Sequence, residues 1–110
     1  MKLYLEDIKI ANERIVKYTK NINFSGFCGN YMVIDAVIRN LSIIGEAIKN
    51  ISNELKKKYP EIPWAEIIGM RNKTIHEYFG VDENILWKTI RQDIPKLQKQ
   101  ILGIIKEEKR

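Results

Sequence analysis

The chain has 110 residues, of which 45% are hydrophobic, and it carries a formal net charge of +5. Its length favours a single domain over residues 1–110, and no apolar run approaches the roughly 18 residues that cross a bilayer. The single cysteine, Cys28, excludes an intramolecular disulfide, and the charged N-terminus is unlike a signal peptide. We therefore expect a cytoplasmic protein that does not contact a membrane. The positive charge is compatible with a polyanionic partner, although solvated helix ends explain most of it.

A one-sided apolar spacing predicts a first helix from about Leu3 to Lys20, interrupted by Asn12. A segment rich in Asn, Gly and Ser follows over residues 21–30 and predicts a break. The second predicted helix is the clearest, because its apolar stripe alternates steps of three and four residues for about 21 residues. The stripe consists of Ile34, Val37, Leu41, Ile44, Ile48, Ile51 and Leu55.

A polar stripe follows the same helical spacing along the second helix. It consists of Asp35, Arg39, Ser42 and Glu46. An ion pair between Asp35 and Arg39 would contribute a few tenths of a kcal/mol if it is exposed. Because the rest of this helix is so apolar, we expect it to pack on more than one neighbour.

Proline and glycine punctuate the second half of the chain. Pro63 predicts the start of a third helix, from Trp64 to about Phe79, and Gly80 predicts its end.

A last helix is expected from Glu83 to about Glu107, capped by Asp82 and kinked or locally broken at Pro95. No segment reads convincingly as a strand. The expected fold is therefore all-α, an antiparallel bundle of four to five helices.

The residues with the most suggestive chemistry lie within the third predicted helix. His76 is the only histidine, and its side chain has an unperturbed pKa of about 6.5, close to neutral pH. On a regular helix Arg71 projects into the apolar stripe beside Trp64, with Tyr78 on the same side. Asn72 precedes His76 by four residues and could orient the imidazole. An arginine on an apolar face breaks the binary pattern, and such breaks often mark functional sites or interfaces.

Each of these residues also has a plainer explanation. Arg71 could extend its charged end to solvent, or pair with an acid such as Asp35 or Glu46. His76 could be an ordinary polar residue at the flank of a helix. Four such residues within eight positions favour a site over these separate explanations.

The chemistry that these types suit is cleavage of RNA without a metal. His76 would take the proton from a ribose 2′-hydroxyl or give one to the leaving 5′-oxygen, and Arg71 would neutralise charge on the phosphate. The product would be a 2′,3′-cyclic phosphate. No Cys/His set has zinc-ligand spacing, and there is no Gly-rich phosphate loop. Because the reaction needs both an acid and a base, one histidine per chain predicts a symmetric dimer that places two motifs in one cleft.

The eight residues from Arg71 to Tyr78 resemble the R-x4-6-H motif of the HEPN superfamily. More closely, they resemble the R-N-x-x-x-H-x-Y form of the HepT toxins. Further segments that resemble this family bring the similarity to nearly the whole chain. They are Asp35 to Leu41, Ile44 to Ala47, Trp64 to Met70 and Trp87 to Leu97.

The resemblance implies an all-helical homodimer in which the motifs of two protomers face a shared cleft. HepT-like toxins are metal-independent endoribonucleases of toxin–antitoxin pairs and need no cofactor. Their antitoxin resembles a minimal nucleotidyltransferase, and in some pairs it attaches AMP to the motif tyrosine. By this resemblance Arg71 and His76 would be catalytic, Asn72 would support them, and Tyr78 would be the candidate for AMPylation.

Two other functions compete with a ribonuclease toxin. The chain could be a non-catalytic helical module that holds RNA, a nucleotide or the nucleotidyltransferase without cutting. It could also be a plain helical scaffold, which would leave Arg71 on the apolar stripe unexplained.

Overall fold

The computed structural model describes residues 2–76 and 80–109, and for residues 2, 75 and 76 it describes the backbone alone. Apart from two strands of two residues each, the elements in this part of the chain are helices, which confirms the all-α expectation. None of the described helices is both long enough and apolar enough to span a membrane.

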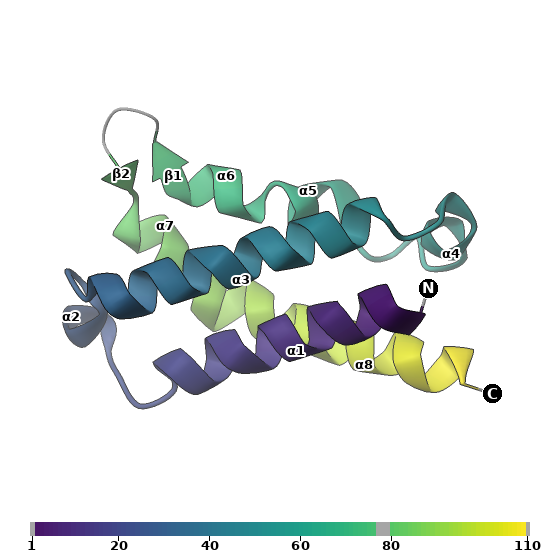
Figure 1. Cartoon of the computed structure of the whole chain (residues 1–110), viewed down its shortest axis with the longest axis horizontal. Helices are drawn as coiled ribbons and strands as arrows, with labels where there is room; N and C mark the ends of the chain where they lie inside the picture. Colours follow the sequence, from purple (N-terminus) through teal and green to yellow (C-terminus); the bar gives the residue numbers. More distant parts are fainter. Residues whose placement is uncertain (1, 77–79, 110) are drawn as a thin grey trace.

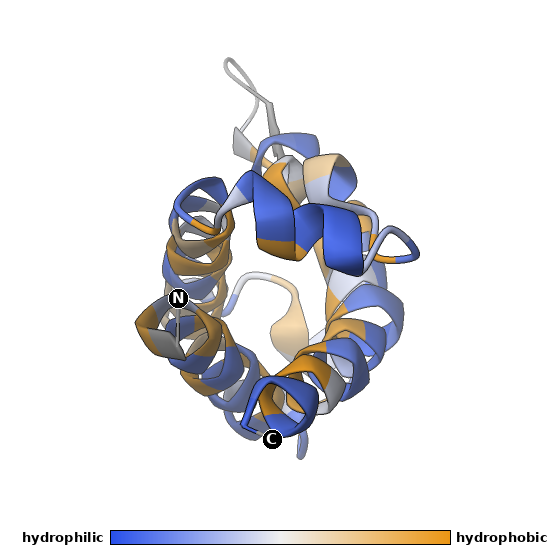
Figure 2. Ribbon diagram, turned by 90° about the vertical axis from the view of Figure 1, so that its right-hand side faces the viewer, coloured by the Kyte–Doolittle hydropathy of each residue, from blue (hydrophilic) through white to orange (hydrophobic). Residues whose placement is uncertain are grey.

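Three long helices form the centre of the fold. They are α1 (Lys2–Thr19), α3 (Tyr31–Lys49) and α8 (Ile94–Glu108). Helix α1 packs along both α3 and α8 and runs antiparallel to them, so the two chain ends lie at the same end of the molecule (Figure 1). Viewed along the helices, apolar residues face inward and polar residues face outward (Figure 2). The apolar stripes predicted from the sequence therefore form the core, including Ile8, Ile44 and Ile101, which have no exposed surface.

Asn12, which interrupts the apolar spacing of α1, is also fully buried. Neither polar atom of its side chain has a hydrogen-bond partner in the described structure. Burying an amide in this state costs free energy, so the interruption read from the sequence is a polar residue inside the core.

The segment expected to be a plain break contains a short helix, α2 (Phe24–Phe27). Asn23 caps it, because its Oδ1 accepts a hydrogen bond from the Gly26 N–H at 2.8 Å. The ring of Trp87 lies 6.2 Å from that of Phe24 and 4.9 Å from that of Phe27. This aromatic cluster anchors the connection between α1 and α3.

The second helix is shorter than its stripe predicts. It ends at Lys49, and a separate helix, α4 (Asn53–Lys58), carries Leu55. Ser52 accounts for the restart, because its Oγ caps α4 by accepting the Leu55 N–H at 3.2 Å. Ile51 and Leu55 are buried, so the apolar stripe of α3 continues into the core beyond the end of the helix. The expected Asp35–Arg39 ion pair does not form among the described residues.

The third predicted helix, from Trp64 to about Phe79, is wrong beyond Thr74. It is divided into α5 (Trp64–Ile68) and α6 (Met70–Thr74), which meet at Gly69. The chain then forms two short antiparallel strands, β1 (Ile75–His76) and β2 (Gly80–Val81). The expectation of no strand was therefore also wrong. Phe79 lies outside the described residues.

The last helix begins where expected, because Asp82 Oδ1 accepts the Ile85 N–H at 3.0 Å. It comprises α7 (Glu83–Lys88), a π-helical turn η1 (Thr89–Asp93) and α8. The predicted local break at Pro95 is confirmed by η1, a wide helical turn that ends at Asp93, two residues before the proline. Proline has no N–H to donate to Arg91, so the regular hydrogen-bond ladder cannot continue there.

Arg91, at the exposed side of η1, contacts the end of α1, the loop that follows α1, and α7. Its Nη2 donates to the carbonyl of Thr19 at 2.9 Å and to that of Ile22 at 2.6 Å. Its guanidinium lies 4.2 Å from the ring centre of Trp87. Because the last carbonyls of a helix have no partner within it, Arg91 completes the C-terminus of α1 and favours its dipole.

We predict that Arg91→Ala lowers the free energy of unfolding by about 2 kcal/mol, because two charge-assisted hydrogen bonds and a cation–π contact are lost. Urea denaturation followed by circular dichroism measures this. Arg14→Ala, which removes an exposed arginine with no described hydrogen bond, should change it by less than about 0.5 kcal/mol. Equal midpoints for the two variants would contradict the role given to Arg91.

A polar contact joins α4 to the end of α8. Glu108 Oε2 accepts hydrogen bonds from Lys58 Nζ and Tyr59 Oη, each at 2.7 Å. Loss of solvation, assisted by the hydrogen bond to Glu108, raises the pKa of Tyr59 to about 12. The hydrogen bond from Lys58 lowers the pKa of Glu108.

A raised tyrosine pKa means that the folded state holds the phenolic proton more tightly than the unfolded state. The Tyr59 contribution is therefore complete below the unfolded pKa of about 10 and is lost as the pH rises toward about 12. We predict that the stability difference between wild type and Tyr59→Phe is constant at neutral pH and shrinks between about pH 10 and 12. Urea midpoints of both proteins across this range test it; a difference independent of pH would refute it.

Candidate functional site

Arg71 and Asn72 lie next to each other on α6, and both are exposed. Arg71 Nη1 donates to Asn72 Oδ1 at 3.4 Å, a long hydrogen bond. The expectation that Arg71 lies in the apolar stripe beside Trp64 is wrong. The chain breaks between α5 and α6 at Gly69, so a rotation of 100° per residue does not continue from Trp64 to Arg71.

The two acids considered as partners for Arg71 do not pair with it. Among the described residues, Arg71 has no ion pair with Asp35 or with Glu46. In the part of the chain that the structure describes, no carboxylate forms an ion pair with its guanidinium, and the hydrogen bond to Asn72 uses one of its five N–H donors. An exposed arginine in this state can receive an anion from solution.

Thr74 is the last residue of α6, and its hydrogen bonds fix the backbone at the start of the next segment. Its side chain is completely buried, and its Oγ1 donates to the carbonyl of Arg71 at 2.7 Å. Its own carbonyl accepts the backbone N–H of Asp82 at 2.6 Å. The strands continue this pairing, with Ile75 opposite Val81 and His76 opposite Gly80. Gly80 has a φ of +79°, a conformation that suits a residue without a side chain.

The predicted acid–base residue therefore stands on a strand rather than on a helix. Asn72 and His76 are not successive-turn neighbours, because α6 ends between them at Thr74. The described structure places the His76 backbone in β1, close in sequence to Arg71, while its imidazole lies outside the description. Tyr78, the candidate modification site, lies wholly outside the described residues.

A groove of about 270 Å³ runs between α3 and the α5–α6 segment. Arg71 and Asn72 line one wall of it, and α3 provides the other. Lining residues from α3 are Leu41, Ser42, Gly45, Glu46 and Lys49, and Ile68 lies at the end of α5. The groove thus brings Arg71 and Asn72 together with Ser42 and Glu46, two of the four residues in the polar stripe of α3.

Gly45 permits the close approach that forms this groove. A Cβ atom on Gly45 would lie 3.3 Å from the carbonyl oxygen of Ile68, tighter than ordinary side-chain contacts. The absence of a side chain therefore lets the end of α5 lie directly against α3. Gly45 is itself buried, at the floor of the groove.

Lys49 is a further charged residue of the groove, and it lies outside the polar stripe predicted from the sequence. Its Nζ lies 3.4 Å from Glu46 Oε1, and both side chains are largely exposed. The signal was present in the spacing, because residues 42, 46 and 49 lie on one side of a helix. Among the described residues, no group of three His, Cys, Asp or Glu side chains is placed to hold a metal ion.

Comparison with known proteins identifies the relatives of this chain. Residues 8–104 match the model of a family described as ribonuclease HepT-like. A protein from Thermococcus cleftensis named "Probable ribonuclease HepT" is 54% identical over 97 residues, which cover 88% of each chain. A candidate RNase from Caldanaerobacter subterraneus subsp. tengcongensis is 45% identical over 96% of this chain and 95% of its own.

A candidate RNase from Methanocaldococcus jannaschii is 43% identical, over 92% of this chain and 93% of its own. No solved structure matches the chain. The family match spans both the groove and the segment from Arg71 to His76. The chain belongs to the HepT-like ribonuclease family and is an endoribonuclease.

Proposed function

We propose that this protein is the toxin of a toxin–antitoxin pair and acts in the cytoplasm as a metal-independent endoribonuclease. The observation that carries the proposal is the exposed Arg71 beside Asn72, which has no carboxylate partner among the described residues and lines a groove of a HepT-like chain. We further propose that residues 1–110 form one HEPN-like helical domain.

In the proposed reaction Arg71 binds the scissile phosphate through its planar guanidinium. His76 assists the proton transfers of an in-line attack by the neighbouring ribose 2′-hydroxyl. The bond from the 2′-oxygen to phosphorus forms as the bond to the 5′-oxygen breaks. The 2′-hydroxyl gives up its proton, and the leaving oxygen gains one. Asn72 supports Arg71 by accepting its hydrogen bond, which limits the positions of the guanidinium.

The two proton transfers are the reason for proposing a homodimer. One chain has one histidine, and the reaction needs a base at the 2′-oxygen and an acid at the 5′-oxygen. A two-fold arrangement would place a second His76 and a second Arg71 in the same cleft. The RNA would then lie across both protomers.

The proposed antitoxin is a minimal nucleotidyltransferase that modifies Tyr78. The phenolic oxygen would attack the α-phosphorus of ATP, pyrophosphate would leave, and AMP would remain on the tyrosine. Tyr78 lies seven positions after Arg71 in the sequence. A bulky anion there would compete for the arginine and repel RNA.

We predict that Arg71→Ala and His76→Ala each lower the cleavage rate of a single-stranded RNA by at least about 100-fold, because charge stabilisation or proton transfer is lost. Arg71→Lys should restore little, since an ammonium lacks the planar fork. Cleavage gels with end-group analysis for cyclic phosphate measure this, with Arg14→Ala as the control. Binding without cleavage by the wild type would instead favour a non-catalytic module.

We predict that incubation with the cognate nucleotidyltransferase and ATP adds the mass of one AMP group to the wild type and none to Tyr78→Phe. Intact-mass spectrometry followed by peptide mapping measures this addition. Tyr31→Phe is the matched control, because Tyr31 is 72% exposed and distant in sequence. Transfer to any residue other than Tyr78 would remove it from the proposed role.

A further inference from the structure

The groove at Arg71 contains a second cation, on its opposite wall. Arg71 comes from α6, whereas Lys49 comes from the last turn of α3. Both side chains are exposed, and both line the same space of about 270 Å³. A single phosphate on Arg71 would use only one side of this groove. A chain of phosphates could contact both sides.

Lys49 forms a weak ion pair that an incoming phosphate can replace. Its one described contact is with Glu46, at 3.4 Å, with 57% of the lysine side chain and 71% of the glutamate side chain exposed. Ion pairs that are this exposed are weak, since water screens both charges. An RNA phosphate arriving in the groove could therefore displace the carboxylate from the ammonium.

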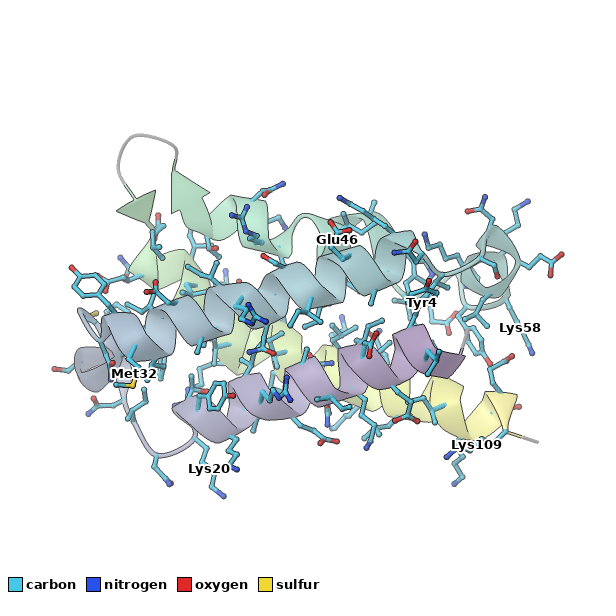
Figure 3. The ribbon with its side chains drawn as sticks, in the orientation of Figure 1. Tyr4, Lys20, Met32, Glu46, Lys58 and Lys109 are labelled. Atoms are coloured by element: carbon cyan, nitrogen blue, oxygen red, sulfur yellow. The ribbon has the colours of Figure 1, made fainter. Side chains whose placement is uncertain are left out.

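Glu46 places a negative charge at the groove, which disfavours binding of an anion there. It lies on α3 at the border with α5, beside the groove (Figure 3). Its negative charge attracts Lys49 and repels any phosphate bound to Arg71 or Lys49. Glu46 and Lys49 should thus have opposite effects on binding of RNA.

From this arrangement we infer that Lys49 forms a phosphate-binding subsite for RNA, separate from the phosphate on Arg71, and that Glu46 holds Lys49 when RNA is absent. The inference rests on the proposed function, since it takes the ligand of the groove to be RNA. Lys49 contributes affinity for the RNA backbone rather than for base identity. It is a binding residue and takes no part in the proton transfers.

The test measures binding of a short, fluorescein-labelled, single-stranded 2′-O-methyl RNA of mixed sequence to the full-length protein. This probe has no free 2′-hydroxyl and so cannot be cleaved by the proposed reaction. Lys49→Ala should raise Kd about fivefold and lower the slope of log Kd against log salt by about 0.7. Glu46→Gln should lower Kd by a similar factor.

The matched control is Lys9→Ala. Lys9 is also a helical lysine in an ion pair, with Glu13 at 3.1 Å; its side chain is half-buried, and it does not line the groove. Its loss removes the same net charge and should change Kd less than twofold. Lys49→Arg, which keeps the positive charge, should retain most of the binding.

Two results would overturn the subsite. One is a Lys49→Ala variant that matches Lys9→Ala in both Kd and salt slope. The other is a Glu46→Gln variant that weakens binding as much as Lys49→Ala does, which would make the pair structural. If either occurs while Arg71→Ala abolishes cleavage, the proposed ribonuclease stands without the subsite. If the binding effects appear but wild-type protein cuts no RNA, the subsite stands and the catalytic proposal fails.

Discussion

The candidate site depends on the contact between Gly45 of α3 and the end of α5. At this point a Cβ atom on residue 45 would lie 3.3 Å from the backbone carbonyl oxygen of Ile68, which is a tight contact. The chain then turns at Gly69 into α6, which carries Arg71. The distance between the two walls of the groove is therefore set by a close contact with the backbone. An added Cβ atom would require the end of α5 to shift by a few tenths of an ångström relative to α3.

Much of the fold could be predicted from the spacing of apolar residues. The long helices α1, α3 and α8 each bury one continuous stripe, so their period is visible in the sequence. The start of the last helix at Asp82 and the break at Pro95 were also predictable, because both depend on local chemistry. Periodicity could not show the end of α6, because that end depends on pairing with a later segment of the chain. The carbonyl of Thr74 pairs with the N–H of Asp82, and strand pairing then replaces helix.

The positions of single residues in the candidate site were also not predictable from helical periodicity alone. On a regular helix Arg71 would lie among apolar side chains, so the sequence predicted an unusual, buried arginine. In the structure Arg71 is exposed, it has no ion pair with an acidic residue among the residues described, and it faces the polar residues of α3 across the groove. Lys49 joins that wall because α3 passes beside α6, a relation between elements that no local pattern contains. The roles of His76 and Tyr78 still rest on the motif in the sequence.

The end of α6 at Thr74 also bears on the spacing of the motif. In the HEPN superfamily four to six residues separate the arginine from the histidine. On a continuous helix, each added residue would turn the histidine by about 100° and point it away from the arginine. Here Arg71 stands on a helix and His76 on a hairpin strand, so extra residues could be absorbed where the helix gives way to the strand. A motif that divides its two residues between different elements can vary in length without each added residue turning the histidine around a helix axis.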